Sequence, residues 1–362
     1  MATHFIQRFS VRLFTAIRQR IDSISAWIRT QPRVAPWIYP VSDSLGNPES
    51  RYREFNLQYF ASFYEQERML ADQPRMDFYH AAISRHIRKG DRVIDLGTGT
   101  GILAAFAARA GASKVYAIDH STILEHAKTL AEANGIDTVE FVATHSTAFK
   151  IEEPVDAIVH EQMGDCLFDE GMMANVSDLR DRLLKPGGRI IPSLFELYCE
   201  PVEVKPVFRV PFLWELNVHG YSYAAMEWHR PQNPEYYQLR SSDPGFIHHF
   251  LGKPEPVMEI DLHTVTESEL PQTITFRRTV DRASQLDGYV IYFRALVDAD
   301  LSLSSAPLDS NRAPHWGFRI LRTEQDSFAE GDIIEVRLAV GSWADLDTWR
   351  WSHVKIPAAR GS

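Results

Sequence analysis

Two glutamates, Glu161 and Glu170, stand nine residues apart directly after the apolar run from Val155 to His160. In a parallel α/β sheet, ligand-binding and catalytic groups gather at the carboxyl ends of the strands, so this segment is a candidate active site. Two carboxylates can bind a planar guanidinium cation through charge-assisted hydrogen bonds and draw positive charge away from one of its nitrogens. Two unrelated loop acids are the alternative interpretation.

A glycine-rich segment, Asp95-Leu96-Gly97-Thr98-Gly99-Thr100-Gly101, lies upstream of the two glutamates. Its glycines allow the backbone to approach a ligand closely at a helix N-terminus. Dinucleotide-binding proteins use a similar turn, so the glycines alone are weak evidence. Asp95 at its start and Asp119, placed to bond two ribose hydroxyls, favour S-adenosylmethionine instead. Arg75 offers a cation for the carboxylate of that cofactor.

Alternating helices and strands between Met69 and Pro192 must position these groups. Strands are expected at 92–96, 114–119, 138–142, 155–160 and 189–191, after a turn at 184–188, and helices at 69–87, 102–110 and 122–134. This alternation predicts an α/β, Rossmann-like parallel sheet with helices on both faces.

The pattern changes after Pro192, where short alternating runs replace helical periodicity. The runs lie at 196–202, 257–263, 272–278, 289–296, 317–321 and 333–340, and they predict an antiparallel β-barrel or sandwich. The expected division is a basic helix and linker at 1–45, the cofactor-binding part at 46–192, and the β part at 193–362. An aromatic-rich insert spans about 207–256.

The loop from Glu161 to Glu170, with Met163-Gly164 and Cys166-Leu167-Phe168 between the acids, resembles the double-glutamate loop of the protein arginine methyltransferases. The resemblance covers roughly residues 55–345 and places this chain as a divergent class I member. It is also carried by Tyr59-Phe60, Met69-Leu70-Ala71-Asp72, Arg75, the segment from Asp95 to Ala112, the segment from Leu184 to Pro192, and Pro314-His315-Trp316 in place of a Thr-His-Trp motif.

The resemblance implies an S-adenosylmethionine-dependent N-methyltransferase of the arginine guanidino group, with Glu161 and Glu170 as the guanidinium clamp. It also implies that His315 pairs with Asp72, as a proton relay or as a structural bridge. The residues that it and the glycine motif place at the cofactor are Gln66, Arg75, Asp95, Gly97, Thr98, Gly99, Gly101, Asp119, His120, Thr147 and Glu161. The residues expected at the substrate pocket are Met69, Met163, Asp165, Met172 and Trp316.

The sequence departs from the family at several of these positions. Gln162 and Asp165 replace a Trp and a Tyr of the loop, Gln66 replaces a His, and Thr147 substitutes for an acid near the adenine. Asp165 could pair with the α-ammonium group of free arginine or another small guanidine, which makes such a molecule the alternative to protein substrates. A catalytically inactive methyltransferase-fold binding protein is a further alternative, but its expected signature, a broken glycine motif or a missing glutamate, is not seen.

Composition excludes several classes of protein. The net charge of −10 over 362 residues argues against a nucleic-acid partner. Two cysteines are too few for a disulfide framework or a cysteine-rich zinc site, so no metal is expected and a reducing, cytoplasmic setting is the default.

Residues 1–33 contain six arginines and one acid, and their apolar residues recur at helical spacing. They predict one amphipathic helix, followed by a proline-rich linker. Packing on its own domain or on a dimer partner is favoured over membrane-surface attachment or a targeting role. The aromatic insert stands where the family has its dimerisation arm, so the resemblance implies a homodimer.

Overall fold

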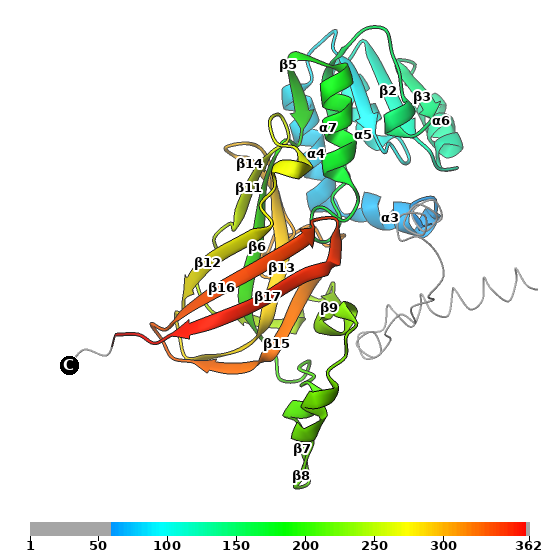
Figure 1. Ribbon diagram of the computed structural model, residues 1–362. Helices are drawn as coiled ribbons and strands as arrows, with labels where there is room; N and C mark the ends of the chain where they lie inside the picture. The colour runs from blue at the N-terminus through cyan, green and yellow to red at the C-terminus, as the bar shows by residue number, and fades with distance from the viewer. Residues whose placement is uncertain (1–58, 360–362) are drawn as a thin grey trace, which may run out of the picture. The chain divides into compact units, whose positions relative to one another are not determined.

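The structure is a computed structural model, and it describes residues 59–359 (Figure 1). The amphipathic helix expected within residues 1–33 and the linker that follows it lie outside the described residues. Among the residues that are described, no helix is both long and apolar enough to cross a membrane.

A five-stranded parallel sheet holds the glycine-rich segment and the two glutamates. Its strands are β1 (Arg92–Leu96), β2 (Lys114–Asp119), β3 (Val139–Ala143), β4 (Val155–His160) and β5 (Leu184–Ile191), in the order β3-β2-β1-β4-β5. All four neighbouring pairs are parallel. The predicted Rossmann-like fold is confirmed, and the strand order reverses at β1, where such sheets bind ligands. The turn expected at 184–188 lies inside β5, where the pairing register with β4 shifts.

The helices around this sheet are α3 (Phe63–Ala71), α4 (Gln73–His86), α5 (Ile102–Arg109), α6 (Leu124–Ala133) and α7 (Met172–Leu183). The prediction of one helix over 69–87 was wrong, because the chain divides into α3 and α4 at Asp72. Asp72 has an extended backbone, and its carboxylate accepts a hydrogen bond from the Arg75 N–H, with Pro74 in the first turn. An acidic N-cap followed by proline starts a new helix here.

Antiparallel sheets follow Pro192, as the sequence predicted. The longer path runs β10 (Ile247–Phe250), β6 (Leu194–Val204), β13 (Ser284–Asp298), β15 (Phe318–Phe328) and β9 (Gln238–Ser241), with β11 (Met258–Asp261) on β6 and β14 (Leu301–Ser304) on β13. A second sheet contains β12 (Thr273–Thr279), β16 (Ile333–Ser342) and β17 (Asp345–Ile356). Phe293 and Leu321 of the first sheet share one hydrophobic core with Leu338 and Trp349 of the second.

The insert between β6 and β10 contains short elements only. They are η3 (Leu213–Glu215), β7 (Asn217–Val218), β8 (Tyr221–Ser222), η4 (Ala224–His229), η5 (Pro234–Tyr237), strand β9, and η6 (Pro244–Phe246). The β7–β8 hairpin projects away from the sheets (Figure 1). At the base of the insert, Phe212 and Trp214 stack and are buried, whereas Tyr221 and Trp228 near its end are exposed.

Candidate active site

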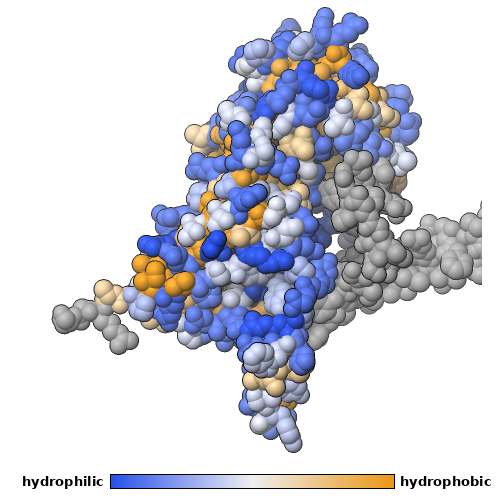
Figure 2. Space-filling model, in the orientation of Figure 1, coloured by the Kyte–Doolittle hydropathy of each residue, from blue (hydrophilic) through white to orange (hydrophobic). Residues whose placement is uncertain are grey.

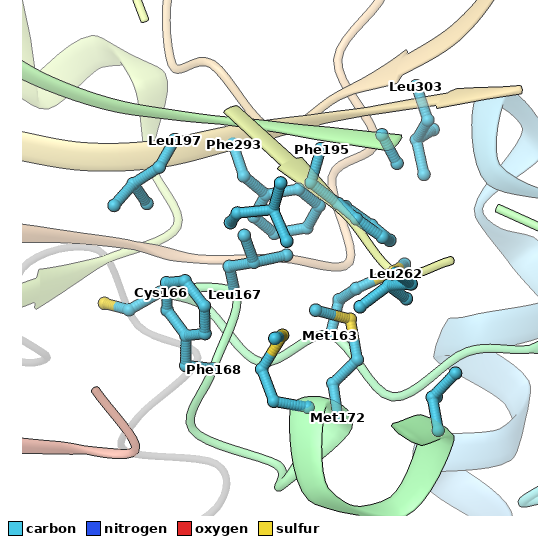
Figure 3. Packing of buried hydrophobic residues seen from close by; sticks show 14 of the residues in the cluster. Met163, Cys166, Leu167, Phe168, Met172, Phe195, Leu197, Leu262, Phe293 and Leu303 are labelled. Carbon is cyan, nitrogen blue, oxygen red and sulfur yellow. The ribbon is translucent and has the colours of Figure 1, made fainter. Parts of the chain in front are cut away.

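The loop between the two glutamates is anchored by its apolar middle. Met163, Cys166, Leu167 and Phe168 are buried and pack with the residues of β6 and β13 (Figure 3). A tight turn closes between the Leu167 N–H and the Gly164 carbonyl at 2.9 Å. Leu167 adopts a φ of 74°, a strained conformation for a non-glycine residue that its complete burial maintains. This core holds both ends of the loop, and therefore both glutamates, in fixed positions.

Glu161, at the first end of the loop, forms a nearly buried ion pair. Its Oε2 lies 2.7 Å from an Arg75 NH2 group. The other terminal nitrogen of Arg75 donates to the Met69 carbonyl at 2.8 Å, and the guanidinium also lies 6.0 Å from the Trp316 ring. Burial raises the pKa of Glu161, and the charge of Arg75 opposes that rise. Arg75 thus orients one carboxylate of the predicted clamp.

Glu170, at the other end of the loop, accepts no hydrogen bond from any group within residues 59–359. Burial, and after it the negative charge of Glu161, raises the pKa of Glu170 well above its usual range. Glu170 therefore lies within electrostatic range of Glu161. An additional cation between them would relieve both causes of the raised pKa.

The glycine-rich loop joins β1 to α5 in conformations that favour glycine. Gly97, Gly99 and Gly101 have φ values of 71°, 54° and 84°. A Cβ on Gly99 would lie 3.1 Å from Oε1 of Gln66, so the Gln66 side chain covers this loop. Asp119, at the end of β2, accepts the Gly99 N–H at 3.0 Å. Its carboxylate oxygens keep further lone pairs for ribose hydroxyls.

The hydrogen bonds of Asp95 indicate whether the glycine-rich loop can accommodate an aminoacyl nucleoside. Its Oδ2 accepts hydrogen bonds from the Thr98 hydroxyl and the Ala104 N–H, but its buried Oδ1 has no partner in the part of the chain that is described. Burial raises the pKa of Asp95 to about 7. Arg75 likewise keeps an unpartnered buried Nε–H. The free acceptor, Asp95 Oδ1, fits the ammonium group of such a ligand, and the free donor, the Arg75 Nε–H, fits its carboxylate.

His120 and Thr147 lie beyond the ends of β2 and β3 and are exposed. His145 connects them: its ring lies 5.6 Å from that of His120, and its Nδ1 is 2.9 Å from the Thr147 hydroxyl. Both residues thus share the strand-end edge of the sheet with Asp119, the edge at which the cofactor was predicted.

His315 contacts Asp72 as expected, but through its backbone N–H and not through its side chain. The His315 backbone N–H donates to Asp72 Oδ2 at 2.8 Å, because Asp72 uses its other oxygen to cap α4. The His315 ring instead faces Glu65, with Nδ1 3.6 Å from Oε1. Burial, assisted by nearby arginines, lowers the pKa of His315 well below its usual range. The contact between Asp72 and the His-Trp motif is thus a structural bridge.

Asp165 also differs from its predicted role. Its Oδ2 lies 2.7 Å from Nε of Arg240, and its Oδ1 accepts the Gly317 N–H at 2.8 Å. Both oxygens of this buried carboxylate therefore connect the loop to β9 and to the segment before β15. The hypothesis that Asp165 binds the ammonium group of free arginine loses the free carboxylate that it needed.

Most of the residues expected at the substrate pocket are buried in this structure. Met163 and Met172 belong to the core beneath the loop (Figure 3), and Met69 is also buried. Trp316 is only 2% exposed and donates its indole N–H to the Met163 carbonyl, so it does not line an open entrance. These side chains therefore pack against the loop from Glu161 to Glu170 and stabilise it.

Four residues at the site were not expected from the sequence. Glu65 is buried beside His315, and Tyr79 donates its hydroxyl to the His160 carbonyl at 3.0 Å. Asn175 of α7 donates to Gln162, and the Cys166 N–H donates to Asp169. Tyr79 lies on the buried face of α4 among Phe78, Ala82 and Ile83, and Glu65 lies beside Gln66 on the buried face of α3. The other two pairings carry no sequence signal.

Comparisons with known proteins agree with this geometry. A family model described as ribosomal protein L11 methyltransferase matches residues 80–194. Protein arginine N-methyltransferase PRMT10 of Oryza sativa subsp. japonica is 33% identical over 311 residues, which cover 77% of this chain and 81% of that protein. The crystal structure of Arabidopsis thaliana protein arginine methyltransferase 10 superposes with a TM-score of 0.67 at 27% identity, covering 80% of this chain and 92% of the other.

A further solved structure, the Trypanosoma brucei PRMT1 enzyme–prozyme complex with AdoHcy, has the same TM-score of 0.67 at 23% identity and shares the fold. The match to the curated relative from Oryza sativa, together with the Rossmann-like sheet, identifies the class of the protein as a methyltransferase. With 33% identity over 311 aligned residues that cover 77% of this chain, the chain belongs to the protein arginine N-methyltransferase family.

Proposed function

We propose that this protein transfers methyl groups from S-adenosylmethionine to the guanidino group of arginine residues in proteins. The observation that carries the proposal is the pair of half-buried glutamates at the two ends of one loop, with Arg75 holding the first in an ion pair and no ion pair to the second within residues 59–359. A guanidinium cation would supply the missing partner of Glu170. The same family membership that gives the chain's class supports arginine as the acceptor.

The residues proposed to hold the cofactor are those that surround the glycine-rich loop. Asp119 would bond the ribose, Asp95 and Arg75 would face the amino-acid part, and His120 and Thr147 would lie at the base. Gln66 would cover the loop from α3. The cofactor supplies a methyl group on a positively charged sulfur. Since the acceptor is also a cation, the carboxylates must lower the repulsion between the two.

The two glutamates would have distinct roles. Glu161, held by Arg75, would position the planar guanidinium through charge-assisted hydrogen bonds. Glu170, which has no such partner, would become ionised as the cation arrives and draw positive charge away from the attacking nitrogen. Asp72 and Trp316 are proposed as positioning residues, because their hydrogen bonds fix α4 and the loop relative to the antiparallel sheets.

Protein substrates are favoured over free arginine, because the negative charge of Asp165 is already paired with Arg240. The test is methyl transfer from labelled S-adenosylmethionine to free L-arginine and, in parallel, to an arginine-rich protein extract. Label on protein that is absent with Glu161→Gln supports the proposal. Label on free arginine alone would move the function to small molecules, and no label on either would contradict it.

Substrate affinity should depend on pH through Glu170. Because the pKa of Glu170 is raised in the free enzyme, binding a guanidinium at a pH below that pKa should release a proton. Affinity should therefore increase with pH, by up to about tenfold per unit for one proton, and level off above the free-enzyme pKa. Calorimetry of an arginine peptide, in two buffers of different ionisation enthalpy with S-adenosylhomocysteine present, would measure the released proton. Affinity that is independent of pH, with no proton released, would contradict this role.

A homodimer is proposed as the working assembly. Trp228 is 91% exposed and Tyr221 76% exposed in the insert. Figure 2 shows apolar residues among polar ones on the part of the molecule that projects from the sheets. An apolar groove of about 290 Å³, lined by residues of α5, α6 and β3 and by Leu70, offers a complementary surface. Two such contacts related by a twofold axis would close a dimer.

If the insert forms the dimer contact, a charged residue introduced into it should weaken dimerisation. Trp228→Asp should convert a species of twice the monomer mass into monomer in sedimentation equilibrium, because an exposed aromatic anchor is lost. Val354→Asp is the matched control, since Val354 is an exposed apolar residue of β17 outside the insert. A monomeric parent protein, or a dimer unaffected by Trp228→Asp, would count against this assembly.

A further inference from the structure

A cluster of one glutamate and two histidines lies at the edge of the longer antiparallel sheet. Glu203 of β6 stands between Val202 and Val204, which are buried, so its side chain is on the opposite face of the strand. On the neighbouring strand β10, His249 pairs directly with Glu203. The register shifts between Ile247 and His249, which makes His248 the extra residue of a β-bulge. The bulge brings two consecutive histidines to one glutamate.

The distances in this cluster are close to those between ligands of one metal ion. His248 Nδ1 lies 3.1 Å from Glu203 Oε1, and His249 Nε2 lies 4.0 Å from Oε2. One ligand atom from each of the three side chains lies within 4.8 Å of the other two. Ligands at 2.0–2.2 Å in a tetrahedral site are about 3.4 Å apart, so a small side-chain adjustment would complete the geometry.

Neighbouring groups hold two of the three ligands in place. The Ser284 hydroxyl donates to the Arg282 carbonyl and lies 2.8 Å from His249 Nε2, so it accepts the Nε2 proton when no ion is bound. A metal ion at Nε2 would displace that proton. The Gln285 N–H donates to Glu203 Oε2 at 2.8 Å and orients the carboxylate.

We propose that Glu203, His248 and His249 bind a divalent transition-metal ion, best matched by zinc. Two imidazoles and one carboxylate are a ligand set typical of zinc with an open fourth position for water. Softer metals would call for thiolates, and calcium or magnesium would call for more oxygen ligands. The sequence predicted no metal site, because the pairing of His248 and His249 with Glu203 depends on the bulge.

The ion would join the two ends of the insert. Glu203 is the penultimate residue of β6, and the two histidines belong to β10, the four-residue edge strand to which the chain returns. Residues 205–246 lie between these strands. Closing a long loop with a metal restricts the unfolded chain and secures a short edge strand. The ion would therefore stabilise the base from which the insert projects.

Zinc titration of the tag-free full chain, after dialysis against a chelator, tests this proposal. We expect one zinc ion per chain by calorimetry and equilibrium dialysis. Glu203→Gln and His249→Ala should each weaken binding by at least about tenfold, the lower range for loss of a metal-site partner. His263→Ala is the matched control, because His263 and Asp261 form an exposed pair 3.0 Å apart outside the cluster. It should bind zinc as the parent protein does.

X-ray absorption at the zinc edge and amide exchange provide two further readouts. The absorption spectrum should contain imidazole nitrogens at about 2.0–2.1 Å, and zinc should slow amide exchange in residues 247–250. Circular dichroism and methyl transfer check that the variants fold. Failure of the folded parent protein to bind zinc would overturn the proposal, as would binding that survives both ligand substitutions. Binding without slower exchange in β10 would overturn the role at the base of the insert. None of these outcomes depends on the proposed methyl acceptor.

Discussion

Replacing Glu161 by glutamine should lower the single-turnover rate of methyl transfer by about 10²- to 10³-fold, the cost of removing one preorganised electrostatic contact from an active site. Glutamine keeps the size of the side chain but loses the charge that Arg75 now balances at 2.7 Å. It also presents an N–H group where the guanidinium needs an acceptor. The effect on the rate should fall on the chemical step at saturating cofactor.

Glu125→Gln is the matched control for this substitution. Glu125 is an exposed glutamate of α6 that pairs with Lys128 on the surface, so its loss should leave the rate unchanged. Binding of S-adenosylhomocysteine to Glu161→Gln, measured by calorimetry, separates the loss of chemistry from loss of the cofactor site. A rate within threefold of the parent enzyme would remove Glu161 from the proposed clamp.

The parallel sheet was predictable because its strands are short apolar runs that end in glycine or an acid. β1, β2 and β4 begin and end where the sequence predicted. Helix α7 was not predicted, and its start offers little signal, since its N-cap is Gly171 with no side-chain hydrogen bond. The break between α3 and α4 was missed although Asp72 and Pro74 mark it, because the apolar spacing continues across them.

The sequence predicted that antiparallel sheets follow Pro192, but it did not predict all of their strands. β17, the twelve-residue strand from Asp345 to Ile356, was missed although it pairs with β16 over most of its length. Its burial alternates only weakly, so its sequence has no clear apolar face. β9 and β10 were absorbed into the insert because each has only four residues.

Residue types at the site were easier to predict than their partners. The glutamates and the glycine loop are recognisable from local sequence, but Asp72 and His315 are separated by 243 positions. Local patterns cannot show which atom of a residue meets a distant partner. The backbone N–H of His315 took the place predicted for its ring, and Arg240 took the place predicted for a substrate at Asp165.

A buried ion pair connects the two antiparallel sheets. Arg278 of β12 donates two hydrogen bonds of 2.7 Å to the Glu200 carboxylate of β6. The Glu255 N–H donates a third hydrogen bond to Glu200. Both side chains of the pair are almost completely buried, so each carboxylate oxygen depends on protein donors for its stabilisation. The pair lies far in sequence from the methyl-transfer residues and should matter for folding.

Arg278→Leu should therefore destabilise the protein by about 3–5 kcal/mol, because it leaves the Glu200 carboxylate buried without its cation. Arg277→Leu, the preceding residue, is the matched control: Arg277 is mostly exposed and pairs with Glu335, so its loss should cost no more than about 1 kcal/mol. Urea unfolding of the two variants measures the difference.

The pH dependence of the Arg278→Leu variant gives a second check on the cause. Burial raises the folded-state pKa of Glu200 even with Arg278 present, and loss of that cation should raise it further above its value in the unfolded chain. A raised carboxyl pKa stabilises the folded state below the unfolded pKa, and this stability is lost as pH rises through the folded pKa. The loss of unfolding free energy in Arg278→Leu, relative to the parent protein, should therefore become smaller as pH is lowered. A deficit that is independent of pH, or equal to that of Arg277→Leu, would mean that packing and not the buried charge holds these sheets together.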